Sequence, residues 1–406
     1  MATNTIPSIE TLPVEIFHRI FDNLNAQTIL FSIRSVDRLF RAVVSTYGRF
    51  SFDFKSISQS DFHLLCRLVN PQNVISLTLC NNDHTPNQLA LFITLVRLRQ
   101  FTRLHSVTFL GIDEVQFNKF LKSISVDSLT SFSLNIQNYD NRRKKTTSNL
   151  LSSIMSQKCL RKLELGINND RLASVSWPLN CTIEYLIINE NITYDNIYNM
   201  LVSFVQLHTL IIKQNFSIAK NIIVTNSFPK LTSLTIEKLN TTVDNFESFL
   251  SMTPSLIKLK ILGEGWILNG KQWEQIIQIH LPHLHNFQFS VSDNKPRAQT
   301  RDDLQLIIET FQSSFWTEHK KWFVACDFVR DRPHKIQLYS IPICKYVDRY
   351  EVSSEKVFIS NSTIKFHNDP LITNNINKLI LPLKETTTGY LDKGVCYIFI
   401  ICILMK

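Results

Sequence analysis

The chain has 406 residues, enough for two or three domains or for one long array of repeats. Its 44% hydrophobic and 19% charged residues are typical of a folded protein with a large core, and its 8 glycines argue against glycine-rich phosphate loops. A net charge of +9 permits contact with acidic partners or nucleic acid. The 8 cysteines include no Cys-x-x-Cys pair, which favours reduced, packed thiols over a zinc site or a disulfide framework.

Residues 9–47 predict a small module of three short helices. Pro13 can be the first residue of the first helix, where a missing N–H costs nothing, and Glu15 lies in the first turn. Asn25 and Asp37 are candidate N-caps of the second and third helices, because their side chains can accept hydrogen bonds from free backbone N–H groups.

The first helix has a wide apolar face. At about 100° per residue, its large apolar side chains cover an arc of about 160°. These side chains are Val14, Ile16, Phe17, Ile20, Phe21 and Leu24. A module of about 40 residues has little core of its own. We therefore expect this face to contact either the end of the following domain or another protein.

After a connecting segment (48–73), residues 74–292 carry one pattern nine times: apolar, two residues, apolar, one residue, apolar, two residues, then often asparagine. The alternation predicts a short strand with one buried face, and the asparagines are expected to satisfy backbone groups where the chain leaves the strand. Between strands, apolar residues at i, i+3 and i+4 predict helices at 89–98, 117–124, 149–155, 196–204, 245–252 and 273–281. The second apolar position recurs every 23 to 31 residues, at Leu77, Val107, Phe132, Leu163, Leu186, Leu210, Leu234, Leu259 and Phe287.

These repeats resemble the leucine-rich-repeat family, especially its ribonuclease-inhibitor-like branch, in which each repeat has one strand and one helix. The resemblance covers residues 74–292. It implies an α/β fold: a horseshoe-shaped solenoid with the strands on its concave side, preceded here by the small helical module. The motif is specific for the fold and carries no information about the ligand.

Side chains that flank the buried strand positions are expected to project from the concave face and to bind a target protein. The face is not strongly basic with interleaved aromatic residues, so we expect no nucleic-acid partner. The charged and aromatic candidates for target binding are Lys162, Glu164, Tyr185, Lys213, Glu237, Lys258 and Lys260.

Two other polar clusters have a simple interpretation. The run RRKK (142–145) is predicted to be a solvated loop, although a nuclear-localisation or nucleic-acid patch is an alternative. His280, His283 and His285 are close in sequence, and exposed turn histidines are a better interpretation than a metal site.

The sequence LPVEIFHRIFDNL (12–24) is similar to the opening of an F-box. The resemblance implies that the module docks the Skp-type adaptor of a cullin–RING (SCF-type) ubiquitin ligase complex, while the repeats bind a protein substrate. In this sequence Asp37, Leu39 and Phe40 stand in the region where the family usually has a Cys and a Trp. The residues that match, and are therefore predicted to bind the adaptor, are Leu12, Pro13, Glu15, Ile16, Ile20, Phe21 and Leu24, with Ile33 and Val36 in the second helix.

A different interpretation is that the N-terminal helices only cap the first repeat, since the ends of a solenoid need a cover. The protein is then a leucine-rich-repeat scaffold with no role in a ligase. Under both interpretations we predict no enzyme, no catalytic residues, no cofactor and no metal site, because the sequence lacks Walker, GxGxxG, HExxH and GxSxG motifs.

Residues 293–375 predict an irregular insertion or capping region, with a helix at 304–315 and a β-hairpin formed by 321–330 and 334–342. Residues 376–406 predict a restart of the repeats and an apolar end. Its run of 11 apolar residues (395–405) is short of the roughly 20 that a membrane span needs, so we expect a buried strand or a truncated chain end, and no membrane partner. The N-terminus does not resemble a signal peptide, and we expect a cytoplasmic and/or nuclear protein.

Overall fold

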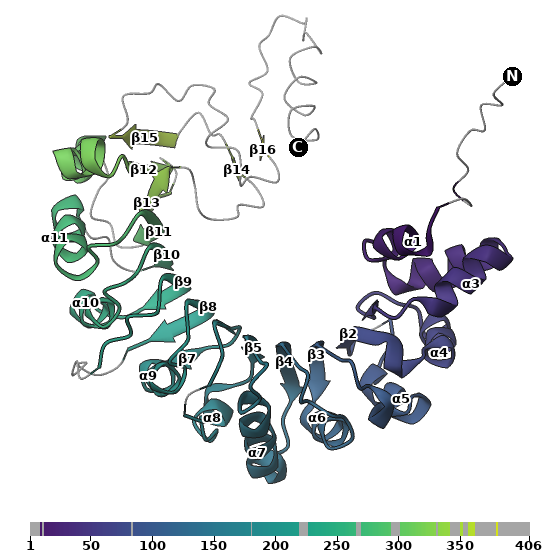
Figure 1. Ribbon diagram of the computed structural model, residues 1–406. Helices are drawn as coiled ribbons and strands as arrows, with labels where there is room; N and C mark the ends of the chain where they lie inside the picture. The colour runs from purple at the N-terminus through teal and green to yellow at the C-terminus, as the bar shows by residue number, and fades with distance from the viewer. Residues whose placement is uncertain are drawn as a thin grey trace, which may run out of the picture.

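The computed structural model describes residues 9, 12–82, 84–179, 181–218, 226–264, 269–293, 301–329, 332–341, 350–351, 356–361 and 379–380. These residues form a mixed α/β fold built on one open sheet of 14 strands. The strands line the inner side of an arc, and the helices line its outer side (Figure 1). Along the sheet the strand order is β1-β2-β3-β4-β5-β6-β8-β9-β10-β11-β13-β12-β15, and β7 pairs with β8.

Most of the sheet is parallel, and only its C-terminal end is antiparallel. The parallel strands are β1 (Phe50–Asp53), β2 (Val74–Cys80), β3 (Ser106–Asp113), β4 (Ser131–Asn138), β5 (Lys162–Gly166), β6 (Tyr185–Ile188), β7 (Ile192–Thr193), β8 (Thr209–Ser217), β9 (Ser233–Asn240), β10 (Lys258–Glu264) and β11 (Asn286–Asp293). The antiparallel strands are β12 (Phe323–Val329), β13 (Arg332–Ile341) and β15 (Lys356–Ser360). Two further strands, β14 (Tyr350–Glu351) and β16 (Leu379–Ile380), pair only with each other.

Helices lie along the outer side of the sheet, and in the described residues they connect most of the successive parallel strands (Figure 1). The N-terminal helices are α1 (Val14–Phe21), the π-helix η2 (Thr28–Ile33), α2 (Arg34–Val36) and α3 (Arg38–Thr46). The outer helices are α4 (Gln59–Leu68), α5 (Gln88–Leu95), α6 (Glu114–Leu121), α7 (Lys144–Met155), α8 (Asn169–Leu172), α9 (Tyr194–Ser203), α10 (Val243–Ser251), α11 (Gly270–His280) and α12 (Arg301–Glu309). Short helical turns are η3 (Pro71–Asn73), η4 (Leu98–Gln100), η5 (Asn141–Arg143) and η6 (Phe315–His319).

The nine predicted strands are confirmed, and so is their common register. The second apolar residue of each pattern is the direct partner of its counterpart in the next strand, from Leu77 opposite Val107 through to Leu259 opposite Phe287. The six predicted helices are also confirmed, as α5, α6, α7, α9, α10 and α11. The buried positions therefore align across every pair of these neighbouring strands. As a result, each unit, meaning a strand with the segment that follows it, covers the apolar side of the next unit.

The predicted role of the strand-end asparagines is also confirmed where their bonds are seen. The Asn168 side chain accepts the N–H of Arg171 at 3.0 Å and so caps α8. The Asn191 side chain accepts the N–H of Asn215, in the neighbouring unit, at 3.1 Å. The first bond begins a helix shortly after a strand, and the second connects two neighbouring units.

Two expectations need correction. Residues 48–73, which we expected only to connect, contain β1 and α4, and Phe52 of β1 lies opposite Leu77 of β2. The run 142–145 is not a loop: it spans η5 and the start of α7, because the Asp140 side chain accepts the N–H of Arg142 at 3.0 Å and begins the helical turn.

An aromatic core runs from the N-terminal helices into the sheet. Tyr47, which follows α3, packs edge-on against Phe21 (5.4 Å between ring centres) and against Phe50 (4.9 Å). From Phe50 the ring contacts continue through Phe52 and Phe54 toward the outer helices. These phenylalanines thus lie in the layer between the strands and the helices, where large rings contribute much buried area.

The predicted hairpin lies near the C-terminal end of the sheet, where β15 is the last strand. Strands β12 and β13 are antiparallel partners, as expected, and β13 also pairs with β11, which extends the main sheet. Trp316 is fully buried beside Phe311 (4.8 Å), and its indole N–H donates to the carbonyl of Gly270 at 3.2 Å. The expected apolar run at 395–405 lies outside the described residues, as does most of the expected repeat restart.

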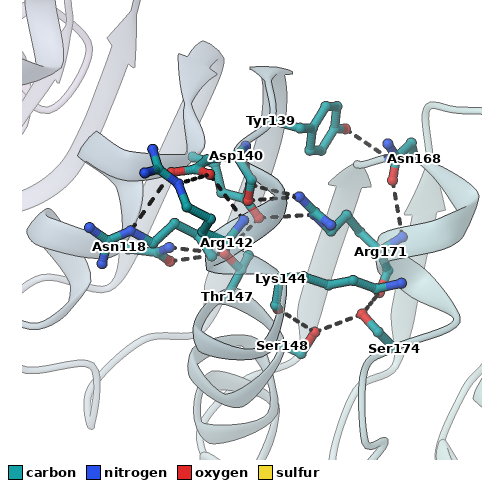
Figure 2. Close-up of polar contacts among 12 residues, drawn as sticks. Asn118, Tyr139, Asp140, Arg142, Lys144, Thr147, Ser148, Asn168, Arg171 and Ser174 are labelled. Carbon is teal, nitrogen blue, oxygen red and sulfur yellow. Dashed lines mark hydrogen bonds and ion pairs between the residues drawn. The ribbon is translucent and has the colours of Figure 1, made fainter.

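A buried ion pair joins three consecutive units beside the four-residue helix α8 (Figure 2). Arg171 donates two hydrogen bonds to the carboxylate of Glu114, each of 3.0 Å, and neither side chain is more than 5% exposed. The same carboxylate accepts the hydroxyl of Thr147 and the N–H of Asp140, each at 2.7 Å. Every polar atom of this carboxylate is thereby satisfied, which a buried charge requires.

Replacing Arg171 tests how much the Glu114–Arg171 pair contributes to the free energy of unfolding. Arg171→Met leaves the Glu114 carboxylate buried without its counter-ion, and we expect the free energy of unfolding to fall by about 3–5 kcal/mol. Urea denaturation measures this loss. The exposed pair Arg161–Glu184 (3.2 Å) supplies the control, because Arg161→Met should cost about 1 kcal/mol or less. Equal losses in the two variants would contradict a structural role for the buried pair.

Candidate functional site

The apolar face of α1 is divided between the inside and the outside of the protein. Phe17 and Phe21 are buried, at 2% and 1% exposure. On the same helix, Ile20 is 40% exposed and Ile16 is 37% exposed, and Val14 is also exposed. Of these five large apolar residues of one short helix, two therefore belong to the core and three are exposed in the described part of the chain.

Exposed apolar residues continue on the neighbouring helices. Val36 of α2 is 64% exposed and Leu39 of α3 is 41% exposed. Helix α3 is fixed against α1 by an edge-on contact of Phe40 with Phe17 (5.3 Å). The Asp37 side chain accepts the N–H of Phe40 at 2.8 Å and caps α3, as predicted. Helices α1 to α3, together with Leu12 just before α1, thus carry a set of exposed apolar side chains, which we call the docking face: Leu12, Val14, Ile16, Ile20, Val36 and Leu39.

The structure changes the predicted adaptor-binding set at several positions. Phe21 is inside the core against Tyr47 and is not available to a partner. Leu24 and Ile33 are half-buried and pack against the same core. Pro13 and Glu15 are exposed, and α1 begins at Val14, one residue later than predicted. Asn25 acts as the predicted cap of the second helix, accepting the N–H of Thr28 at 2.7 Å.

Val14 and Leu39 were missing from the predicted adaptor-binding set, although the structure exposes both on the docking face. For Val14 the signal was present, since it belongs to the apolar arc of the first helix. For Leu39 it was not, because it lies outside the residues that match the F-box pattern.

Hydrogen bonds connect the end of α1 to the residues just before β1. Arg49 donates two hydrogen bonds to the Asp22 carboxylate, of 2.9 and 2.8 Å, and the Tyr47 hydroxyl donates a third of 2.9 Å. The bonds from Arg49, followed by that from Tyr47, outweigh partial burial and hold the pKa of Asp22 below its usual value. Burial, and then the bond to Asp22, raises the pKa of Tyr47 to about 12. Tyr47 therefore remains neutral at all ordinary pH values.

The inner face of the sheet carries two aligned rows of side chains. In one row Lys162 of β5 lies opposite Tyr185 of β6, and in the other Glu164 lies opposite Ile187. The rows begin with serines and threonines on β2 to β4 and reach Lys258 and Lys260 on β10. The predicted target-binding residues therefore lie on one surface, spread over β5, β6, β8, β9 and β10.

Four of the predicted target-binding residues contact each other in pairs. The Lys162 ammonium lies 5.5 Å from the centre of the Tyr185 ring, within range of a cation–π interaction. Lys213 lies 3.4 Å from the Glu164 carboxylate, which also accepts a 2.8 Å hydrogen bond from Asn189. Burial raises the pKa of Glu164, but the Asn189 bond and the Lys213 charge outweigh it, and the pKa lies below its usual value. Glu164 is consequently ionised at neutral pH.

The remaining three residues do not join these pairs. Glu237 and Lys260 are half-buried, and Lys258 is exposed. Within the described residues neither lysine has an ion-pair partner, so both ammonium groups are available to a bound molecule.

In the part of the chain that the structure describes, the histidine cluster has one ion-pair contact. His280 lies 3.1 Å from the Glu247 carboxylate, and among the described residues no group of three or more His, Cys, Asp or Glu could hold a metal ion. None of the helices that the structure describes has both the length and the apolar character needed to cross a membrane.

Comparison with known proteins adds no assignment: no protein-family model matches the sequence, and no curated protein is significantly similar to it.

The Glu164 contacts predict a pH-dependent stability. Because the folded-state pKa is depressed, the contribution is present above the ordinary carboxyl pKa and is lost as the pH falls through the folded value. Glu164→Gln should lower the free energy of unfolding at pH 7 by about 1 kcal/mol. Thermal melts of both proteins between neutral and acidic pH should converge as Glu164 is protonated. A difference that is the same at every pH would show that charge plays no part.

Proposed function

We propose that the protein is an F-box-type substrate receptor of a cullin–RING (SCF-type) ubiquitin ligase. In this proposal the docking face binds the Skp-type adaptor, and the inner face of a leucine-rich-repeat solenoid binds a target protein. The protein performs no chemistry of its own and acts in the cytoplasm or the nucleus.

The observation that carries the proposal is the docking face. In the described part of the chain, 7 of the 16 exposed large hydrophobic residues lie between residues 9 and 39. Clustered exposed apolar side chains are typical of protein-interaction sites. Four of the seven, Leu12, Val14, Ile16 and Ile20, lie within the stretch that resembles an F-box (12–24). The buried residues of that stretch, Phe17 and Phe21, are the ones that a stable module needs for its own core.

The repeat assignment is supported by the stacking of the units. Nine sequence copies correspond to nine parallel strands that are neighbours in one sheet and share one register, with helices along the outer side of the arc (Figure 1). Such arrays expose a long inner surface that suits protein binding. On it, Lys258 and Lys260 have no ion-pair partner among the described residues. This surface is where we place the target protein.

The packing of Tyr47 between Phe21 and Phe50 favours a second function, in which the helices only cover the end of a scaffold. Deleting the helices does not separate the two functions, because the deletion uncovers Phe50 in both cases. A binding experiment with point variants separates them, because a cap needs only its buried residues.

Leu12→Asp with Ile16→Asp should weaken binding to a purified Skp-type adaptor by roughly 100-fold or more, since desolvated anchor residues dominate most interfaces. Both positions are exposed, so the melting temperature should change little. Leu95→Asp with Val202→Asp provides a matched control, with exposures of 36% and 37% on α5 and α9, and should bind as the wild type does. If the wild-type protein does not bind the adaptor, the proposal is wrong and the scaffold function remains.

A further inference from the structure

A shallow hollow of about 310 Å³ lies on the surface of the N-terminal helices. It is lined by Leu30 of η2, by Arg34 and Ser35 of α2, and by Arg41 of α3. Val36 directly follows Ser35 in the chain, and Leu39 precedes Arg41 by two residues. Helices α2 and α3 thus carry both the two arginines of the hollow and exposed apolar side chains of the docking face.

The two arginines are not used inside the protein. Neither Arg34 nor Arg41 makes a side-chain hydrogen bond or an ion pair in the described part of the chain. The carboxylate nearest to them in sequence, Asp37, accepts the backbone N–H of Phe40 at 2.8 Å. Two like charges on one small hollow repel each other, and an anion between them would turn this repulsion into attraction.

The backbone beside the hollow has an unusual form. Helix η2 is a π-helix over Thr28–Ile33, and π-helical turns are rare and occur frequently at functional sites. The Ser35 hydroxyl donates to the carbonyls of Phe31 (2.9 Å) and Ser32 (2.7 Å), which lie in this π-helix. Since the Ser35 hydroxyl proton is used there, the guanidinium groups of Arg34 and Arg41 are the donors that the hollow offers to a ligand.

We infer that the hollow receives the carboxylate of an aspartate or glutamate side chain of the docking partner. The planar guanidinium group matches a carboxylate with two parallel hydrogen bonds, which makes arginine suited to this recognition. Because α2 and α3 carry both these arginines and the exposed Val36 and Leu39, a partner that binds the apolar side chains of these helices can also place an acidic side chain in the hollow, which a free anion does not explain. This inference rests on the proposed function and adds to it the chemistry of the adaptor surface: an acidic side chain flanked by apolar ones.

The test measures the affinity of the full chain for a purified Skp-type adaptor at low and at high salt. Arg34→Ala with Arg41→Ala should weaken binding roughly tenfold or more and should make the affinity less sensitive to salt. Arg67→Ala with Arg99→Ala removes the same charge from two exposed arginines of α4 and η4, and should leave the affinity unchanged. Arg34→Lys with Arg41→Lys keeps the charge, and should restore the salt dependence without the full affinity, because lysine lacks the planar fork.

The outcomes separate this inference from the proposed function. Adaptor binding that is unaffected by Arg34→Ala with Arg41→Ala would contradict the role of the hollow but not the role of the docking face. An equal loss in the Arg67→Ala, Arg99→Ala control also overturns it, because the effect is then one of overall charge. Full rescue by lysine overturns the recognition of a carboxylate by the guanidinium planes. A wild-type chain that does not bind the adaptor overturns both proposals.

Discussion

The packing of Tyr47 between Phe21 and Phe50 joins the N-terminal helices to the sheet, and the two candidate surfaces depend on it. It draws one side of α1 into the core, so that Ile16 and Ile20 are left outside. It also makes the helices and the first strand one packed body, with the hydrogen bonds of Arg49 and Tyr47 to Asp22 as a second connection. A partner bound to the docking face is consequently held at a fixed position relative to the inner face.

Beyond that joint, the sheet is stabilised unit by unit. Each strand contributes apolar side chains to the outer layer, and the aligned register lets every unit cover the next. Aromatic rings fill the layer at both ends of the arc, where Phe54 contacts Phe62 and Phe287 contacts Trp273. Near the short helix α8 the Glu114–Arg171 pair joins two residues that are 57 positions apart in the sequence.

Local patterns were enough to predict the strands, because alternation and a constant register are properties of the sequence alone. The strand β1 escaped prediction although Phe50, Phe52 and Phe54 alternate, since it lacks the leucine spacing of the other copies. The division of the α1 face was not predictable, because it depends on Phe40 and Tyr47, which reach α1 only in the folded chain. The Arg34–Arg41 hollow and the Glu114–Arg171 pair depend likewise on neighbours that the fold brings together. On the inner face, the sequence predicted which residues share a surface, and the structure adds that Lys162 with Tyr185 and Glu164 with Lys213 contact each other.

The central claim is that one module covers the end of the sheet with one set of residues and binds a partner with another. Hydrogen-exchange mass spectrometry of the full chain, with and without a Skp-type adaptor, tests it directly. The account predicts slower exchange on binding in α1 and in the segment from η2 to α3, and unchanged exchange in β2 to β11. Protection along the inner strands or the outer helices, with none in α1, would contradict it.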